Sequence, residues 1–68
     1  MHKQAYDSNG VHIGTFDGEF LYDRMGRITL RVDSDEVYTV DTPCKYIGVY
    51  EDNQAMSIDG SVLFRAKE

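Results

Sequence analysis

The sequence predicts a single all-β domain of four sequential β-hairpins, about eight short antiparallel strands, in a closed or nearly closed pseudo-fourfold arrangement. Turn-forming clusters interrupt the chain at short intervals, and no stretch sustains the apolar period of a helix. A short motif also recurs four times. Since a chain of 68 residues has room for only one core, the four copies are expected to share it.

The recurring motif is a turn signal that begins with an apolar or aromatic residue followed by aspartate. Its copies are Tyr6-Asp7, Tyr22-Asp23, Val40-Asp41 and Ile58-Asp59, at spacings of 16, 18 and 18 residues. In the first two copies a glycine, Gly10 or Gly26, stands three positions after the aspartate. This is typical of a hairpin loop, because the carboxylate accepts a local N–H and glycine adopts a positive φ. We expect hairpins over residues 3–18, 19–35, 36–53 and 54–67, with Pro43 making the third turn irregular.

Strand alternation assigns the two faces, most clearly between Arg27 and Val32, where every second residue is aliphatic. On the second strands this register gives three inward columns: His12, Ile28, Tyr46 and Phe64; Gly14, Leu30, Gly48 and Ala66; and Phe16, Val32 and Tyr50. On the first strands it turns inward Tyr6, Tyr22, Val40 and Ile58, with Phe20, Tyr38 and Met56. The second column consists mostly of very small residues, which predicts a crowded axis.

The repeated Tyr-Asp-x-x-Gly unit and its fourfold count resemble the small bacterial domains called the four-fold β-flower. The resemblance covers residues 3–67. It implies four hairpins around a pseudo-fourfold axis and no established activity, so it carries over a fold and no catalytic residue. Pro43-Cys44 in place of a turn glycine and the shortened fourth turn depart from the pattern.

Composition narrows the classes of function. Seven basic and twelve acidic residues give a net charge of -5, which repels phosphate backbones, so we expect no nucleic-acid partner. Every apolar run is far shorter than the ~20 residues that cross a bilayer, and no signal peptide is recognisable, so we expect no membrane partner and a cytoplasmic location. The single cysteine, Cys44, allows no intramolecular disulfide and is expected to be a buried or partly buried thiol.

Residues with catalytic or metal-binding chemistry are sparse. A nucleophile and base could only be Cys44 and His12, which fall in the turn and the strand of different copies. Acidic residues gather at the connecting turns, but Asp33-Ser34-Asp35-Glu36 lacks the length and the glycine hinge of a calcium loop. We therefore expect no catalytic residue, no cofactor and no metal site.

Two functions from different classes fit these observations. The preferred one is a small structural or protein–protein interaction module that forms a homo-oligomer, as a dimer, or docks on a larger protein. Its candidate interface is the set of apolar residues expected to face outward in copies one and three, namely Val11, Ile13, Ile47 and Val49. The alternative is a small-ligand binding or sensor domain with a tyrosine-lined pocket at one end, formed by His12, Tyr22, Tyr38, Tyr46 and Tyr50.

Overall fold

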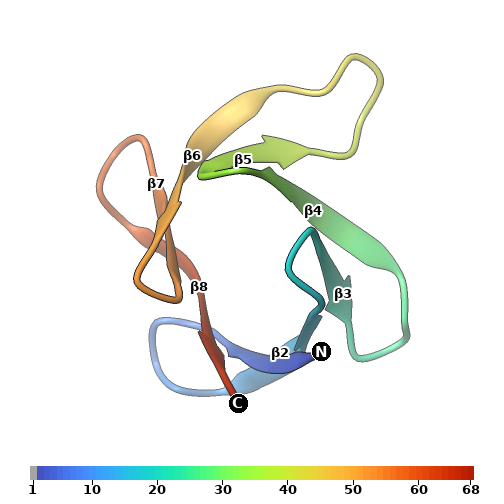
Figure 1. Ribbon diagram of the computed structural model, residues 1–68, viewed down its shortest axis with the longest axis vertical. Helices are drawn as coiled ribbons and strands as arrows, with labels where there is room; N and C mark the ends of the chain where they lie inside the picture. Colours follow the sequence, from blue (N-terminus) through green and yellow to red (C-terminus); the bar gives the residue numbers. More distant parts are fainter. Residues whose placement is uncertain (1) are drawn as a thin grey trace.

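The computed structural model describes residues 2–68, which form eight antiparallel strands without a helix that could cross a membrane. The strands are β1 (Lys3–Tyr6), β2 (His12–Phe16), β3 (Phe20–Asp23), β4 (Ile28–Asp33), β5 (Glu36–Thr39), β6 (Tyr46–Glu51), β7 (Gln54–Ser57) and β8 (Val62–Lys67). Each strand pairs with the next, and β8 pairs with β1, so the sheet closes into a barrel. Figure 1 shows this ring, from which the hairpin loops project. The predicted all-β fold of four hairpins is confirmed.

The first two hairpin turns are held by their aspartates, as the sequence predicts. Asp7 Oδ1 accepts hydrogen bonds from the backbone N–H groups of Asn9 (2.9 Å) and Val11 (3.0 Å). Asp23 Oδ1 accepts the equivalent bonds from Met25 (2.8 Å) and Arg27 (2.9 Å). The carboxylates thus satisfy N–H groups that the tight turns leave without strand partners.

The fourth turn is built two positions earlier in the chain than expected. Ser57 N–H donates to Ser61 O (2.7 Å), as Asp7 N–H donates to Val11 O (2.9 Å). Ser57 is therefore the counterpart of Asp7, and the expected equivalence of Asp59 with Asp7 was wrong. The equivalence of Asp41 with Asp7 was also wrong, because Thr39 closes the third turn. The equivalent positions are Tyr6, Tyr22, Tyr38 and Met56, at spacings of 16, 16 and 18 residues. The longer spacing reflects the third turn, which closes from Thr39 N–H to Lys45 O (2.9 Å).

Each hairpin contains a β-bulge at the same place. In the first hairpin Ala5 pairs with Gly14 and Tyr6 pairs with His12, so Ile13 is an extra residue in β2. The corresponding extra residues are Thr29, Ile47 and Leu63. Because a bulge adds one residue to one strand, it shifts the inward and outward alternation by one position.

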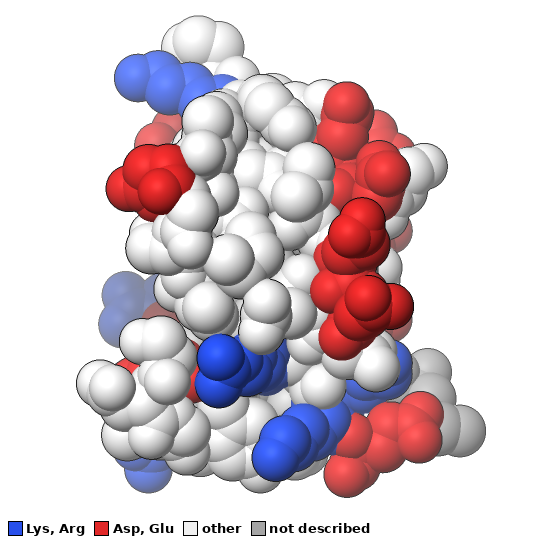
Figure 2. All heavy atoms as spheres, turned by 90° about the vertical axis from the view of Figure 1, so that its left-hand side faces the viewer, with Lys and Arg blue, Asp and Glu red and all other residues white. Residues whose placement is uncertain are grey.

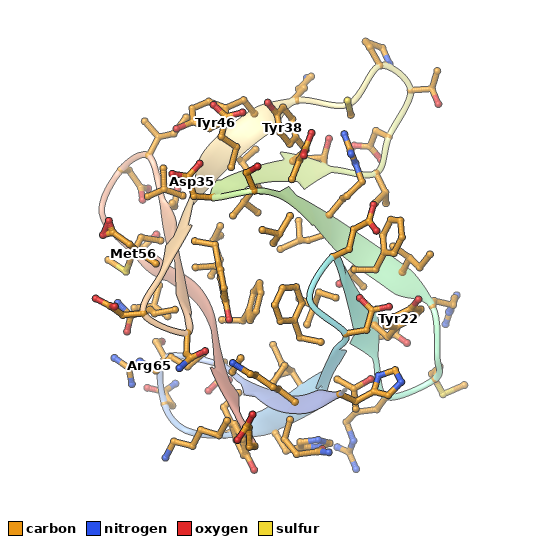
Figure 3. The ribbon with its side chains drawn as sticks, viewed as in Figure 1. Tyr22, Asp35, Tyr38, Tyr46, Met56 and Arg65 are labelled. Carbon is orange, nitrogen blue, oxygen red and sulfur yellow. The ribbon has the colours of Figure 1, made fainter. Side chains whose placement is uncertain are left out.

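The bulges overturn part of the expected face assignment. His12, Ile28 and Tyr46 lie beyond the bulge and face outward together with their partners on the first strands; Ile28 and Tyr46 are 42% and 46% exposed. Figure 3 shows Tyr22, Tyr38, Tyr46 and Met56 outside the ring. The other residues wrongly placed inward are Tyr6 and Phe20, which lie on the outer face, and Val40 and Ile58, which lie exposed in turns. On the first strand of each hairpin, the inward residue is the one just before the equivalent position of Tyr6, Tyr22, Tyr38 or Met56. These inward residues are Ala5, Leu21, Val37 and Ala55.

The barrel is filled by eight buried apolar residues: Ala5, Phe16, Leu21, Val32, Val37, Ala55, Phe64 and Ala66. Phe64 lies at the centre, with its ring centroid 5.2 Å from that of Phe16 and 5.9 Å from that of Tyr50. Phe64 pairs with Ala55 as Gly48 pairs with Val37. Phe64 is therefore the fourth member of the inward column that contains Gly14, Leu30 and Gly48, where Ala66 was expected. The column expected to be almost uniformly small therefore holds the largest buried side chain.

The inner residues alternate in size from one hairpin to the next. In the first and third hairpins a glycine, Gly14 or Gly48, is followed two positions later by an aromatic residue. In the second and fourth hairpins a large residue, Leu30 or Phe64, is followed by a smaller one. Hairpins on opposite sides of the ring thus resemble each other more than neighbouring hairpins do. The alternation lets large residues of one hairpin fill the space left by small residues of the next.

Candidate interaction surface

Outward side chains line up in rows that cross the hairpin boundaries. One row runs from β5 to β8 through Glu36, Val49, Met56 and Val62, whose residues are cross-strand partners. Tyr38 and Tyr46 pair with each other beside this row. We call the apolar members of this surface the β5–β8 face: Tyr38, Tyr46, Val49, Met56, Ile58 and Val62.

The β5–β8 face gathers apolar side chains that the core does not use. Tyr46 is 46% exposed, Val49 is 41% exposed and Ile58 is 68% exposed. Ile58 lies in the β7–β8 turn, and its N–H donates to Ile47 O (2.9 Å), which holds this turn against β6. On a soluble domain, a contiguous exposed apolar surface of this kind usually marks an interaction site.

The two tyrosines of this face are held in place. The rings of Tyr38 and Tyr46 meet edge to face with centroids 5.9 Å apart, and the Arg31 guanidinium lies 5.3 Å from the Tyr38 centroid. The Tyr38 hydroxyl donates to Glu36 Oε1 (2.7 Å), and this bond to a carboxylate, followed by partial burial, raises the pKa of Tyr38. Ordered aromatic rings lose little conformational entropy when a partner covers them.

Charges of both signs border the β5–β8 face. Viewed from the side on which β6 and β7 lie, the molecule shows a broad uncharged area with acidic side chains along one edge and basic side chains below it (Figure 2). Glu36 begins β5 and Glu51 ends β6, and both are exposed. Arg65 on β8 donates from Nε to Gln54 Oε1 (2.8 Å). The two ion pairs among the described residues, Arg27–Asp23 and Arg31–Asp33, use none of these three side chains.

The four residues expected to form an interface divide into two kinds. Val11 and Val49 are exposed, as expected. Ile13 and Ile47 are the bulge residues, and their side chains pack half-buried against the core. The outward placement of these two isoleucines was therefore wrong, and Val49 is the residue of the four that lies on the β5–β8 face.

The five residues expected to line a ligand pocket do not converge. Tyr50 lies inside the barrel, where burial raises its pKa. Tyr22 lies on β3, where partial burial and then the Asp17 carboxylate, which accepts its hydroxyl at 3.2 Å, raise its pKa. His12 lies on β2, with Nε2 2.7 Å from Gln4 Oε1. Only Tyr38 and Tyr46 are neighbours, and residues 2–68 enclose no pocket.

The residues considered for catalysis and cation binding also lie apart. Cys44 is exposed in the β5–β6 turn, which corrects the expectation of a buried thiol, whereas His12 lies on β2. At the first connecting turn, Asp17 Oδ1 accepts the N–H groups of Phe20 (2.7 Å) and Glu19 (2.9 Å), and these bonds lower the pKa of Asp17. Within the described part of the chain, no three His, Cys, Asp or Glu side chains come together in an arrangement that could hold a metal ion.

Sequence reasoning missed most of the β5–β8 face. Met56 and Tyr38 were assigned inward because the alternation was carried through the bulge, and Ile58 was assigned to a strand although it lies in a turn. No residue type marks these bulges, because Ile47 and Leu63 become extra residues only through the way their strands pair.

Comparison with known proteins adds no relative: no family model, curated protein or solved structure matches the chain.

Proposed function

We propose that this protein is a small protein–protein interaction module that binds a protein partner on the β5–β8 face. The observation that carries the proposal is the collection of exposed apolar side chains on one side of the barrel, with acidic side chains along one edge and basic side chains below. An interface of this composition, with an apolar and aromatic centre and a charged rim, is typical of protein partners.

The rest of the fold supports a contact through the outer face of the sheet. All strands of the closed barrel are paired on both sides, so a partner has no strand edge on which to add a strand of its own. A small molecule would need a concave site, and the residues described here form none. The outer face of the sheet is therefore the surface that such a module would use.

A photo-reactive residue at Val49 tests this function. We expect benzoylphenylalanine at this position to form a discrete covalent adduct with a protein on illumination in cells that produce the chain. The matched control is the same substitution at Ile28, which is 42% exposed against 41% for Val49 but lies on β4. Equal labelling at the two positions, or none at either, would contradict the proposal.

We also propose that the domain is a bacterial, cytoplasmic four-fold β-flower. The closed barrel of four hairpins and the turn aspartates Asp7 and Asp23 support this assignment. The exposed thiol of Cys44 fits a reducing compartment, where it would stay unpaired. Fractionation of cells that produce the chain tests the compartment. Recovery of the chain from an oxidising compartment, with Cys44 in a mixed disulfide, would contradict the cytoplasmic assignment.

A further inference from the structure

We infer that the partner on the β5–β8 face is a second copy of this chain, and that the two copies form an isologous dimer. The inference rests on the proposed function, since it names the protein that covers the same face. In an isologous contact each copy presents the same surface, so that surface must be complementary to itself in both shape and charge.

The size of the face suits such a dimer. Stable interfaces of standard size bury about 800 Å² on each partner. The whole chain exposes 4545 Å², and the side that carries the β5–β8 face spans 27 Å by 19 Å. One side of the barrel therefore supplies most of the area that one half of a standard interface requires. A domain this small also gains more from covering apolar surface than a larger one does.

The charges beside the face are self-complementary. Glu36 on β5 pairs with Val49, which pairs with Met56 on β7. Arg65 on β8 pairs with Gln54, so it lies on the opposite side of the Val49–Met56 pair from Glu36. A two-fold axis that lies in the plane of the contact and runs along the strands, between β6 and β7, exchanges these sides. It brings Glu36 of each copy toward Arg65 of the other.

The arrangement of charges around the face also favours a second copy over a partner whose surface charges all have the same sign. A uniformly basic partner would attract the acidic edge and repel Arg65, whereas a uniformly acidic partner would do the reverse. A second copy in the two-fold orientation meets both borders with the opposite sign. The net charge of -5 on each copy opposes association, so the inference depends on the local pairing and on the apolar centre.

Sedimentation equilibrium of the purified chain is the first test. We expect the wild type to sediment at twice the 7.8 kDa of one chain at high micromolar concentration. Val49→Lys places a charge at the centre of the contact and should return the mass to that of the monomer, with an unchanged circular dichroism spectrum. The matched variant Ile28→Lys should remain dimeric. A monomeric wild type, or equal effects of the two lysines, would overturn the inference.

Charge reversal tests the orientation. Glu36→Lys and Arg65→Glu should each weaken the dimer several-fold, because each places like charges opposite one another twice. The double variant restores both pairs with exchanged signs and should dimerise within about twofold of the wild type, as expected for coupled charges. Additive weakening in the double variant would overturn the two-fold arrangement.

The photo-cross-link at Val49 separates this inference from the proposed function. An adduct of twice the chain mass supports the dimer. An adduct of any other mass overturns the dimer and leaves the interaction module standing. The absence of an adduct above the Ile28 control contradicts both.

Discussion

Gly48 on β6 lies so close to Met56 on β7 that a Cβ on Gly48 would come within 2.0 Å of the Met56 carbonyl oxygen. Gly14 has the same relationship to Tyr22, at 1.8 Å. The contact is with the backbone of the next hairpin and not with side chains at the barrel axis. Crowding at these glycines therefore arises where hairpins join, which differs from the axial crowding that their small size suggested.

Gly48→Ala should therefore destabilise the barrel, since a methyl group can be accommodated only if β6 and β7 move apart. Overpacking of this kind costs about 1–3 kcal/mol of unfolding free energy. Urea denaturation measures it, with Ile28→Ala, at an exposed position on β4 outside the β5–β8 face, as the control expected to change the midpoint little. An unchanged midpoint for Gly48→Ala would show that the strands are not held at this distance.

Phe64→Ala should cost about 3–5 kcal/mol, because it empties the centre of the aromatic cluster with Phe16 and Tyr50. Tyr50→Phe keeps the ring and loses only a hydroxyl that is 3.4 Å from Asn53 Oδ1, so its unfolding free energy should stay within about 1 kcal/mol of the wild type. Thermal unfolding followed by circular dichroism compares the two. Similar losses for both variants would mean that the cluster is not the centre of the core.

Ile13→Lys tests the bulge. Ile13 packs half-buried against the core, so a lysine there should cost about 2 kcal/mol or more. Thr15 faces outward between its partners Gln4 and Tyr22, and Thr15→Lys should change stability by no more than about 0.5 kcal/mol. Both lie on β2 two residues apart, so a strand without the bulge would give them the same environment. Equal unfolding midpoints for the two variants would therefore contradict the bulge.

The stability of the domain should decrease in acid because of the turn aspartates. Hydrogen bonds from backbone N–H groups lower the pKa of Asp23, and the bond from Arg27 has the largest effect. Hydrogen bonds from the Ser61 hydroxyl and N–H groups lower the pKa of Asp59. The unfolded chain then binds protons more readily than the folded one. This stabilisation is complete above the ordinary aspartate pKa of about 3.9 and is lost as the pH falls from there through the lower folded value.

Urea midpoints measured from pH 6 to pH 2 check this dependence. Asp23→Asn retains a side-chain acceptor but cannot titrate, so its stability should vary less with pH than that of the wild type. Asp35→Asn, in the exposed β4–β5 turn, serves as the control for loss of a charge. A steeper acid dependence in Asp23→Asn than in the wild type would contradict the role of this turn.

The fold could be predicted because turn chemistry is local. Asp7 and Gly10 specify a loop through bonds within a few residues, and several such loops between short strands leave a hairpin barrel as the compact solution. The third and fourth copies were misaligned because Val40-Asp41 and Ile58-Asp59 imitate the motif, although β5 ends at Thr39 and β7 ends at Ser57.

The faces could be predicted only in part. A bulge at a residue such as Thr29 follows from how two strands pair, and no residue type signals it within a strand of six. The β5–β8 face was harder still, because Val49 becomes a neighbour of Met56 and Val62 only through the pairing of β6 with β7, which joins two different hairpins. A sequence read one hairpin at a time does not place them together.

The closure of the ring between β1 and β8 also has a kinetic consequence. Every other pairing joins strands that follow one another, and isolated hairpins form in about 1–10 μs. The Ala5–Ala66 pairing instead joins the two ends of the chain, so it carries the largest loop-closure entropy and must wait until the other strands are in place. A chain emerging from the ribosome therefore exposes the open edges of β1 and of its last paired strand until β8 arrives. During that interval those edges can pair with another chain, and a truncation before Val62 would make the exposure permanent.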